Sequence, residues 1–233
     1  MVVCGINAFV DGSTDIRLLR KPREEYVYTM NENVRYFPMI YNFLRTTWGK
    51  VIRMDILRQA DYSTYKENAK DFISDDTAFT LANYEKCKRI GAIPEALLYY
   101  RFSDGSVTAK YNPKRIDNNT NIHKFTLSML ESIGDTGADS RLFVDKVFLA
   151  SIQEACKLLF ESDKTYDYKV SEVKRVLETE LMQRLLHTTN EASIIVRDIV
   201  QYVLLETQEC KSITETDVET LKYINGLLKS LGI

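Results

Sequence analysis

The chain has 233 residues and a formal net charge of -2, with 45% apolar and 27% charged residues. These values are typical of a globular protein with a substantial core, and they exclude wholesale disorder and a fibrous class. Lys and Arg are dispersed along the chain, which argues against a nucleic-acid partner. No apolar run is long enough for a transmembrane segment, and the first residues lack a signal-peptide pattern. We therefore expect a cytoplasmic protein, either free or peripheral at the inner membrane face.

The cysteines and histidines do not have the spacing of a metal site. Zinc and redox sites usually place two cysteines close together, and no such pair occurs here. We expect no metal ligands in this chain and four free thiols, at Cys4, Cys87, Cys156 and Cys210.

Apolar periodicity predicts a mixed α/β front. Alternation over Val2–Val10 predicts a strand, and Glu24–Thr29 is a second candidate that could pair with it as a hairpin. Asn31 is a candidate cap for a helix that reaches Leu44, although Pro38 would kink that helix or delay its start. The elements expected next are a helix-spaced segment at 48–58 whose first half could be a strand, a loop at 61–71, a helix from Ser74 to about Arg89, an apolar run at 90–93 ended by Pro94, and a strand at 96–102.

Beyond residues 112 to 120 the pattern becomes helical throughout. Thr214 and Asp217 resemble a capping box at the start of the last helix. We expect two domains, 1–115 and 116–233, with helices dominating overall. The expected helices are 121–133, 139–161, 168–188, 190–208 and 215–231.

Asp75 and Asp76 at the start of the expected helix have two interpretations. Carboxylates are favoured in a first helical turn, and Ser74 could cap the helix. A carboxylate held there could also act as a general base towards an acceptor hydroxyl. The two roles are compatible, because a helix end is a rigid support for a base.

Two other segments also have a structural and a functional interpretation. Trp48 and Lys50 are either a core tryptophan beside a turn, or an aromatic platform and a cation near a sugar or phosphate. Tyr99 and Tyr100 are either strand packing or part of a site. In the second case Arg101 and Ser106 could contact an anionic ligand.

Taken in order, these segments resemble the downstream half of the family 2 glycosyltransferases. The resemblance covers about residues 1–130, and it rests on WGKVIRMDIL, SDDTAF and KRIGAIPEALLYYRFSDGSVT, with VVCGINAFVDGS upstream. It implies the C-terminal half of a GT-A fold and an inverting transfer of sugar from a nucleotide-sugar to a glycan or other hydroxyl acceptor. Asp76 would be the base, with Asp75 beside it. The substrate-binding residues would be Trp48, Lys50, Tyr100, Arg101 and Ser106.

The sequence departs from the family in its upstream half. A complete family enzyme would bind a nucleotide-sugar and a divalent Mn or Mg ion, but no Asp-x-Asp occurs here. The Asp11–Asp15 segment imitates an early family signature but lies too close to Trp48 for a nucleotide fold between them. We therefore expect a truncated glycosyltransferase-like chain with little or no activity alone. The missing half would lie upstream of Met1 or on a partner chain, or the chain would be a relic. The alternative is a non-catalytic helical interaction module.

Overall fold

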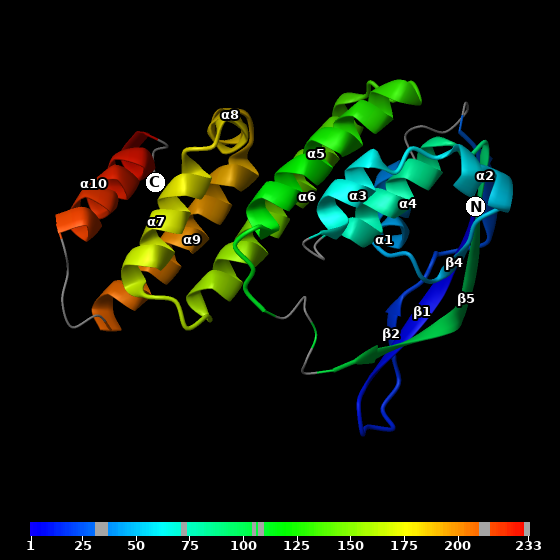
Figure 1. Cartoon of the computed structure of the whole chain (residues 1–233), viewed down its shortest axis with the longest axis horizontal. Helices are drawn as coiled ribbons and strands as arrows, with labels where there is room; N and C mark the ends of the chain where they lie inside the picture. The colour runs from blue at the N-terminus through cyan, green and yellow to red at the C-terminus, as the bar shows by residue number, and fades with distance from the viewer. Residues whose placement is uncertain (31–36, 71–73, 104–105, 107–109, 210–214, 231–233) are drawn as a thin grey trace. The chain divides into compact units, whose positions relative to one another are not determined.

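A computed structural model describes residues 1–30, 37–70, 74–103, 106, 110–209 and 215–230. It combines a small mixed β-sheet with a larger set of helices (Figure 1). Contacts divide the chain into two compact units: Met1–Ala109 with Asn121–Val144, and Lys110–Thr120 with Asp145–Ile233. The first unit contains the sheet and the predicted site residues. Over the described residues, no helix is long and apolar enough to cross a bilayer.

The sheet has the order β2-β1-β5-β3, and β4 also pairs with β1. Strand β1 runs parallel to β5, and the other pairs are antiparallel. The predicted first strand is confirmed, but its predicted hairpin partner is wrong. The partner is β2, which the sequence analysis missed, and β3 pairs with β5 instead. The strands are β1 (Val2–Val10), β2 (Arg17–Arg20), β3 (Tyr26–Thr29), β4 (Lys50–Val51) and β5 (Arg89–Phe102).

Strand β5 passes through Pro94, which the sequence analysis placed at a break. The pairing with β1 moves from Cys4–Ile93 directly to Gly5–Ala96, so Pro94 and Glu95 form a bulge. A bulge leaves residues outside the hydrogen-bonded ladder, and this is where a strand tolerates proline. Gly5 lies opposite the bulge, and a Cβ there would be 2.9 Å from the Glu95 carbonyl oxygen.

Four short helices complete the front of the first unit: α1 (Phe37–Leu44), α2 (Met54–Gln59), α3 (Ser63–Ala69) and α4 (Asp75–Glu85). Helix α1 has Pro38 in its first turn, where the missing N–H costs nothing, and Asn31 lies outside the described residues. The loop predicted at 61–71 is wrong, because α3 occupies most of it. Tyr62 and Tyr65 flank Phe79 of α4, with ring centroids 5.2 and 5.5 Å away, and this packing stabilises the short helix.

The back of the chain is helical, as predicted. Three predicted helices are confirmed to within a residue or so, as α6 (Ala138–Phe160), α9 (Asn190–Glu209) and α10 (Glu215–Ser230); α5 (Arg115–Ser132) begins earlier than expected. The single helix predicted at 168–188 is wrong, because the chain forms α7 (Tyr166–Leu177) and α8 (Glu180–Thr188). Thr179 separates them by accepting the Met182 N–H as the N-cap of α8. Thr214 lies outside the described residues.

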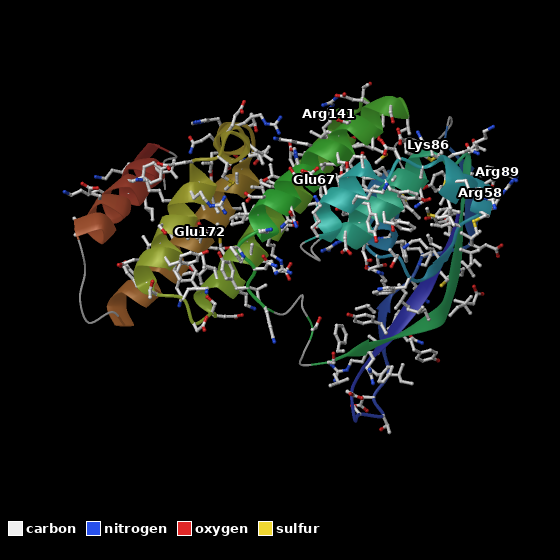
Figure 2. The ribbon with its side chains drawn as sticks, in the orientation of Figure 1. Arg58, Glu67, Lys86, Arg89, Arg141 and Glu172 are labelled. Carbon is white, nitrogen blue, oxygen red and sulfur yellow. The ribbon has the colours of Figure 1, made fainter. Side chains whose placement is uncertain are left out.

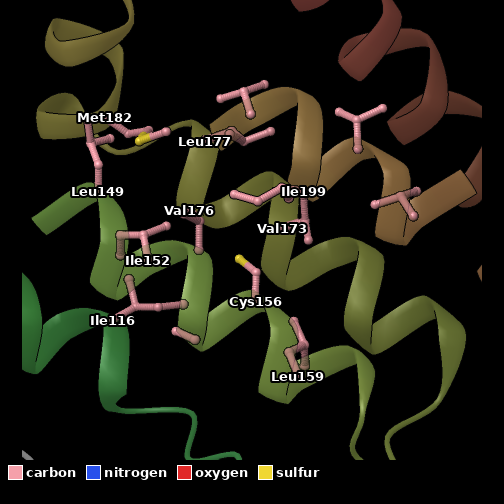
Figure 3. Close-up of a cluster of buried hydrophobic side chains, with 14 of the residues drawn as sticks. Ile116, Leu149, Ile152, Cys156, Leu159, Val173, Val176, Leu177, Met182 and Ile199 are labelled. Carbon is pink, nitrogen blue, oxygen red and sulfur yellow. The ribbon is translucent and has the colours of Figure 1, made fainter. Parts of the chain in front are cut away.

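The core of the second unit is built from the inner faces of these helices (Figure 3). Leu149 and Ile152 of α6 face Val173 and Val176 of α7, and all four side chains are buried. Cys156 is also buried there, and the apolar surroundings raise the pKa of its thiol to about 12. Cys4, Cys87 and Cys156 are free thiols as predicted, and Cys210 lies outside the described residues.

Candidate functional site

The inner face of the sheet has an unusual number of polar residues at one place. Residues paired across neighbouring strands project to the same face. Lys50 pairs with buried Val3, Arg20 pairs with buried Ile6, and Tyr100 pairs with buried Ala8. Three strands therefore direct a lysine, an arginine and a tyrosine to the same face as core side chains.

A turn between α1 and β4, residues 46–49, connects these residues. The turn is fixed to the sheet at Gly49, whose carbonyl oxygen accepts the Cys4 N–H at 3.0 Å. Gly49 has a φ of 73°, a conformation that glycine adopts without strain. A Cβ at Gly49 would also lie only 3.0 Å from the Ile6 side chain. Glycine is therefore required here by both backbone conformation and space.

Thr46 is the centre of the hydrogen bonding in this turn. Its hydroxyl oxygen accepts a hydrogen bond from Arg20 Nη2 at 2.9 Å and donates to the Trp48 carbonyl oxygen at 3.3 Å. Its carbonyl oxygen accepts from Lys50 Nζ and, at 3.0 Å, from the Thr80 hydroxyl of α4. One residue thus links β2, β4 and α4.

Helix α4 holds Asp76 against the same turn. The Thr47 hydroxyl donates to Asp76 Oδ1 at 3.1 Å, and the Thr77 hydroxyl donates to the Arg45 carbonyl oxygen at 3.2 Å. The predicted capping by Ser74 is wrong: Ser74 is left-handed, with φ 58°, and its side chain makes no cap hydrogen bond. The hydrogen bond from Thr47 therefore holds Asp76 in position. The hydrogen bonds that Thr77 and Thr80 of α4 donate to the backbone before β4 hold the helix there.

Burial shifts the pKa of two ionisable groups at this site. The Asp76 pKa is raised, chiefly by burial; the Thr47 hydrogen bond opposes this effect and the nearby Asp75 charge adds to it. The Lys50 pKa is lowered to about 8, chiefly by burial and then by the charge of Arg20, while Asp76 and Cys4 oppose the shift. A carboxylate with a raised pKa is a stronger base than an ordinary aspartate. Asp76 can therefore accept a proton from a hydroxyl bound beside it.

Trp48 lies between Tyr100 and Arg20. The Trp48 and Tyr100 rings are stacked with centroids 4.7 Å apart, and the Arg20 guanidinium carbon lies 5.1 Å over the indole centroid. Two groups cannot occupy one face at these distances, so Tyr100 covers one face of the indole and Arg20 the other. The indole therefore positions Arg20 and is not an open platform for a sugar ring.

The structure thus brings together four of the seven residues selected from the sequence: Trp48, Lys50, Asp76 and Tyr100. Asp75 lies next to Asp76 and acts on it through its charge. Arg101 lies on the opposite face of β5 from Tyr100 and forms an exposed ion pair with Asp11 at 3.7 Å. Ser106 is half-buried, and its N–H donates to the Ser103 carbonyl oxygen.

Arg20 belongs to this cluster but was not among the site residues predicted from the sequence. Strand β2 has its polarity reversed, because Leu18 and Leu19 are exposed while Arg20 is half-buried. The residue contacts Thr46 and Trp48, which are more than 25 positions away. A contact over this sequence distance leaves no local sequence pattern. Only the pairing of β2 with β1 could have identified Arg20 as a site residue.

The described residues do not fit a divalent metal ion, since they contain no group of three or more His, Cys, Asp or Glu side chains placed to hold one. Asp75 and Asp76 are two carboxylates without a third ligand.

A separate hollow of about 540 Å³ lies on the opposite face of the sheet, where Val2 and Val51 project away from buried Val3. Its floor includes the cross-strand row Val51, Val2, Gly91 and Val27, whose three valines are exposed. Lys86 and Arg89, both labelled in Figure 2, are also among its lining residues. None of the selected site residues lines this hollow, so it is distinct from the Asp76 site.

Comparison with known proteins returned no protein-family model, no curated protein and no solved structure that matches the chain. The family resemblance therefore stays a prediction from the sequence segments alone.

Proposed function

We propose that the chain provides the acceptor side of a sugar-transfer site, with Asp76 as the general base. The observation that carries the proposal is the placement of Asp76, which is half-buried, fixed by Thr47 and close enough to Lys50 to influence its pKa. The order of Trp48, Asp76 and Tyr100 along the chain, which resembles family 2 glycosyltransferases, agrees with this placement.

In the proposed reaction Asp76 takes the proton of an acceptor hydroxyl. The hydroxyl oxygen forms a bond to the anomeric carbon of the donor sugar, and the bond from that carbon to the leaving phosphate breaks with inversion. The carboxylate must lie within hydrogen-bond distance of the hydroxyl, and a raised pKa favours the transfer. The nucleoside of the donor and the divalent ion would be held by residues outside this chain, on a partner.

The exposed valine row supports a partner of this kind. Val2, Val27 and Val51 are between 39% and 73% exposed, and they lie side by side on neighbouring strands. Contiguous exposed apolar side chains often mark an interaction surface. The chain alone is then expected to transfer little sugar, and robust transfer by the purified 233-residue protein would contradict the proposed division of labour.

A glycan array probed with the purified chain tests the acceptor role. The wild type is expected to retain one class of neutral glycans, and Asp76→Asn is expected to weaken that binding by about tenfold, because a hydrogen bond to a charged group is lost. Glu67→Gln is the matched control, since Glu67 is an exposed acidic residue of α3 (Figure 2). Absence of glycan binding, or equal binding by Asp76→Asn and Glu67→Gln, would refute the acceptor role.

A further inference from the structure

Arg20 and Lys50 are neighbouring cations, and Lys50 lies near Asp76. Within the part of the chain that the structure describes, no ion pair joins Arg20 or Lys50 to an acidic side chain. Lys50 Nζ is bonded to the carbonyl oxygens of Thr46 and Trp48, and Arg20 Nη2 is bonded to the Thr46 hydroxyl. Asp76 instead accepts a hydrogen bond from the Thr47 hydroxyl.

The charges at this place do not balance. Burial is the main cause that lowers the pKa of Arg20, and the charge of Arg45 lowers it further. Burial likewise lowers the pKa of Lys50, and the charge of Arg20 adds to that effect. Holding like charges together at half-buried positions costs free energy unless an anion compensates them. In a purely structural cluster an internal carboxylate would provide that compensation. Here the nearby carboxylate is Asp76, whose charge acts on Lys50 and only partly opposes the lowering of the Lys50 pKa.

The Arg20 guanidinium is held in one orientation and still has free donors. It lies over the Trp48 indole and 5.9 Å from the Phe43 ring centroid, so two aromatic rings fix its plane. Among the described residues, Nη2 donates to the Thr46 hydroxyl, and Nε is buried without a hydrogen-bond partner. A fixed guanidinium with unused N–H groups, beside an ammonium, matches the oxygens of a phosphate group.

We infer that Arg20 and Lys50 form a binding site for a phosphate group of the substrate, beside Asp76. The inference rests on the proposed function, because it gives the chemical class of a ligand for the same site. Trp48 acts as a positioning residue for Arg20. The phosphate belongs either to the acceptor, as in a sugar phosphate, or to the leaving diphosphate of the donor.

Isothermal titration calorimetry with three probes tests the site and separates the two sources. Glucose 6-phosphate represents a phosphorylated acceptor, uridine diphosphate represents the leaving group, and glucose is the neutral control. We expect one phosphate probe to bind and glucose not to bind. Tighter binding of glucose 6-phosphate would assign the phosphate to the acceptor, and tighter binding of uridine diphosphate would assign it to the donor.

Variants connect the binding to these residues. Arg20→Gln and Lys50→Gln are each expected to lower the affinity for the phosphate probe by about tenfold or more, since each removes a charge-assisted hydrogen bond. Arg141→Gln is the matched control, because Arg141 is exposed and pairs with Glu131 at the surface of the same unit (Figure 2). Circular dichroism establishes that each variant is folded. Failure of both phosphate probes to bind, or an equal loss in Arg141→Gln, would overturn the inference.

Asp76→Asn separates this inference from the proposed function. Removing the Asp76 charge is expected to leave phosphate binding intact or tighten it, because a carboxylate repels the anion. If Asp76→Asn weakens glycan binding while phosphate probes fail, the phosphate site is wrong and the general-base proposal stands. If Arg20→Gln weakens phosphate binding while Asp76→Asn leaves glycan binding unchanged, the phosphate site stands and the general-base proposal is wrong.

Discussion

The Thr47 hydroxyl donates a hydrogen bond to Asp76 Oδ1 at 3.1 Å, and this bond joins the turn before β4 to the first turn of α4. Hydrogen bonding to a carboxylate favours its charged form, whereas burial favours the neutral form. At Asp76 burial is the larger effect, so the pKa is raised in spite of Thr47. Thr47 therefore limits how far the base departs from an ordinary aspartate.

Replacing Thr47 with valine is expected to raise the Asp76 pKa further, because the side-chain donor is lost while the burial remains. Carbon-13 NMR titration of the aspartate carboxyl groups measures this change directly. Thr188→Val, at the exposed end of α8, is a control that should leave the Asp76 titration unaltered. A Thr47→Val protein in which the Asp76 pKa is unchanged or lower would show that the hydrogen bond does not act on this carboxylate.

Lys50 is expected to make the stability of the first unit depend on pH in alkaline solution. Its pKa is about 8 in the folded chain against 10.5 for an unperturbed lysine, because it is buried near Arg20, although Asp76 and Cys4 oppose the shift. Between these values the unfolded chain binds a proton that the folded chain does not. The free energy of unfolding therefore rises with pH across this window.

Urea unfolding at a series of pH values between 7 and 10.5 checks the Lys50 effect. The difference in unfolding free energy between the wild type and Lys50→Met is expected to move in favour of the wild type as pH increases. Lys66→Met, on an exposed position of α3, provides the baseline for the other titrating groups. A wild-type advantage that is constant or shrinks over this range would contradict burial as the dominant cause.

Sequence periodicity was sufficient to predict the bounds of an element wherever that element buries one of its faces and exposes the other. Strand β1 alternates between buried Val3 and exposed Val2, and α6 has buried residues such as Leu149 and Ile152 at helical spacing. These patterns are local, so both elements were predicted nearly to the residue. The same reasoning located Asp76 on a helix, because the apolar spacing of α4 follows it directly.

Elements that depend on distant partners were not predictable in this way. Helix α3 is short and polar, and Tyr65 of this helix and Tyr62 just before it contact Phe79 of a later helix. The strand pairing was misassigned because β1 pairs in parallel with β5, about 90 positions later, which no turn signal reveals. Arg20 became part of the site only through the Thr46 and Trp48 contacts. The site could thus be predicted in part, as Trp48, Lys50, Asp76 and Tyr100.

Gly5 is expected to be intolerant of a side chain. A Cβ at this position would lie 2.9 Å from both the Glu95 carbonyl oxygen and the Lys21 Cβ, and the backbone of the bulge cannot easily move away. Gly5→Ala should therefore lower the unfolding free energy by about 1–3 kcal/mol, the usual cost of overpacking. Thermal and urea unfolding measure the change.

Gly226→Ala is the contrasting variant for this measurement. Gly226 is in the helix α10, and a Cβ there would meet no atom within 4 Å. Alanine is the better helix former, so this change should stabilise α10 by about 0.5–1 kcal/mol. If Gly5→Ala were as harmless as Gly226→Ala, the tight contact at the β5 bulge would not exist in solution.

Leu149 and Leu142 of α6 allow a test of the helical core with two identical substitutions. Leu149 is fully buried in the second unit, within the cluster of Figure 3, whereas Leu142 is 40% exposed. Leu149→Ala removes buried methyl groups and leaves a cavity, so it should lower the unfolding free energy by about 2–5 kcal/mol. Leu142→Ala alters helix propensity by the same amount as Leu149→Ala. It should lower the unfolding free energy by less than about 1 kcal/mol, because it removes little buried surface. Equal costs for the two variants, measured by urea unfolding with far-ultraviolet circular dichroism, would mean that α6 does not bury its Leu149 face in the core.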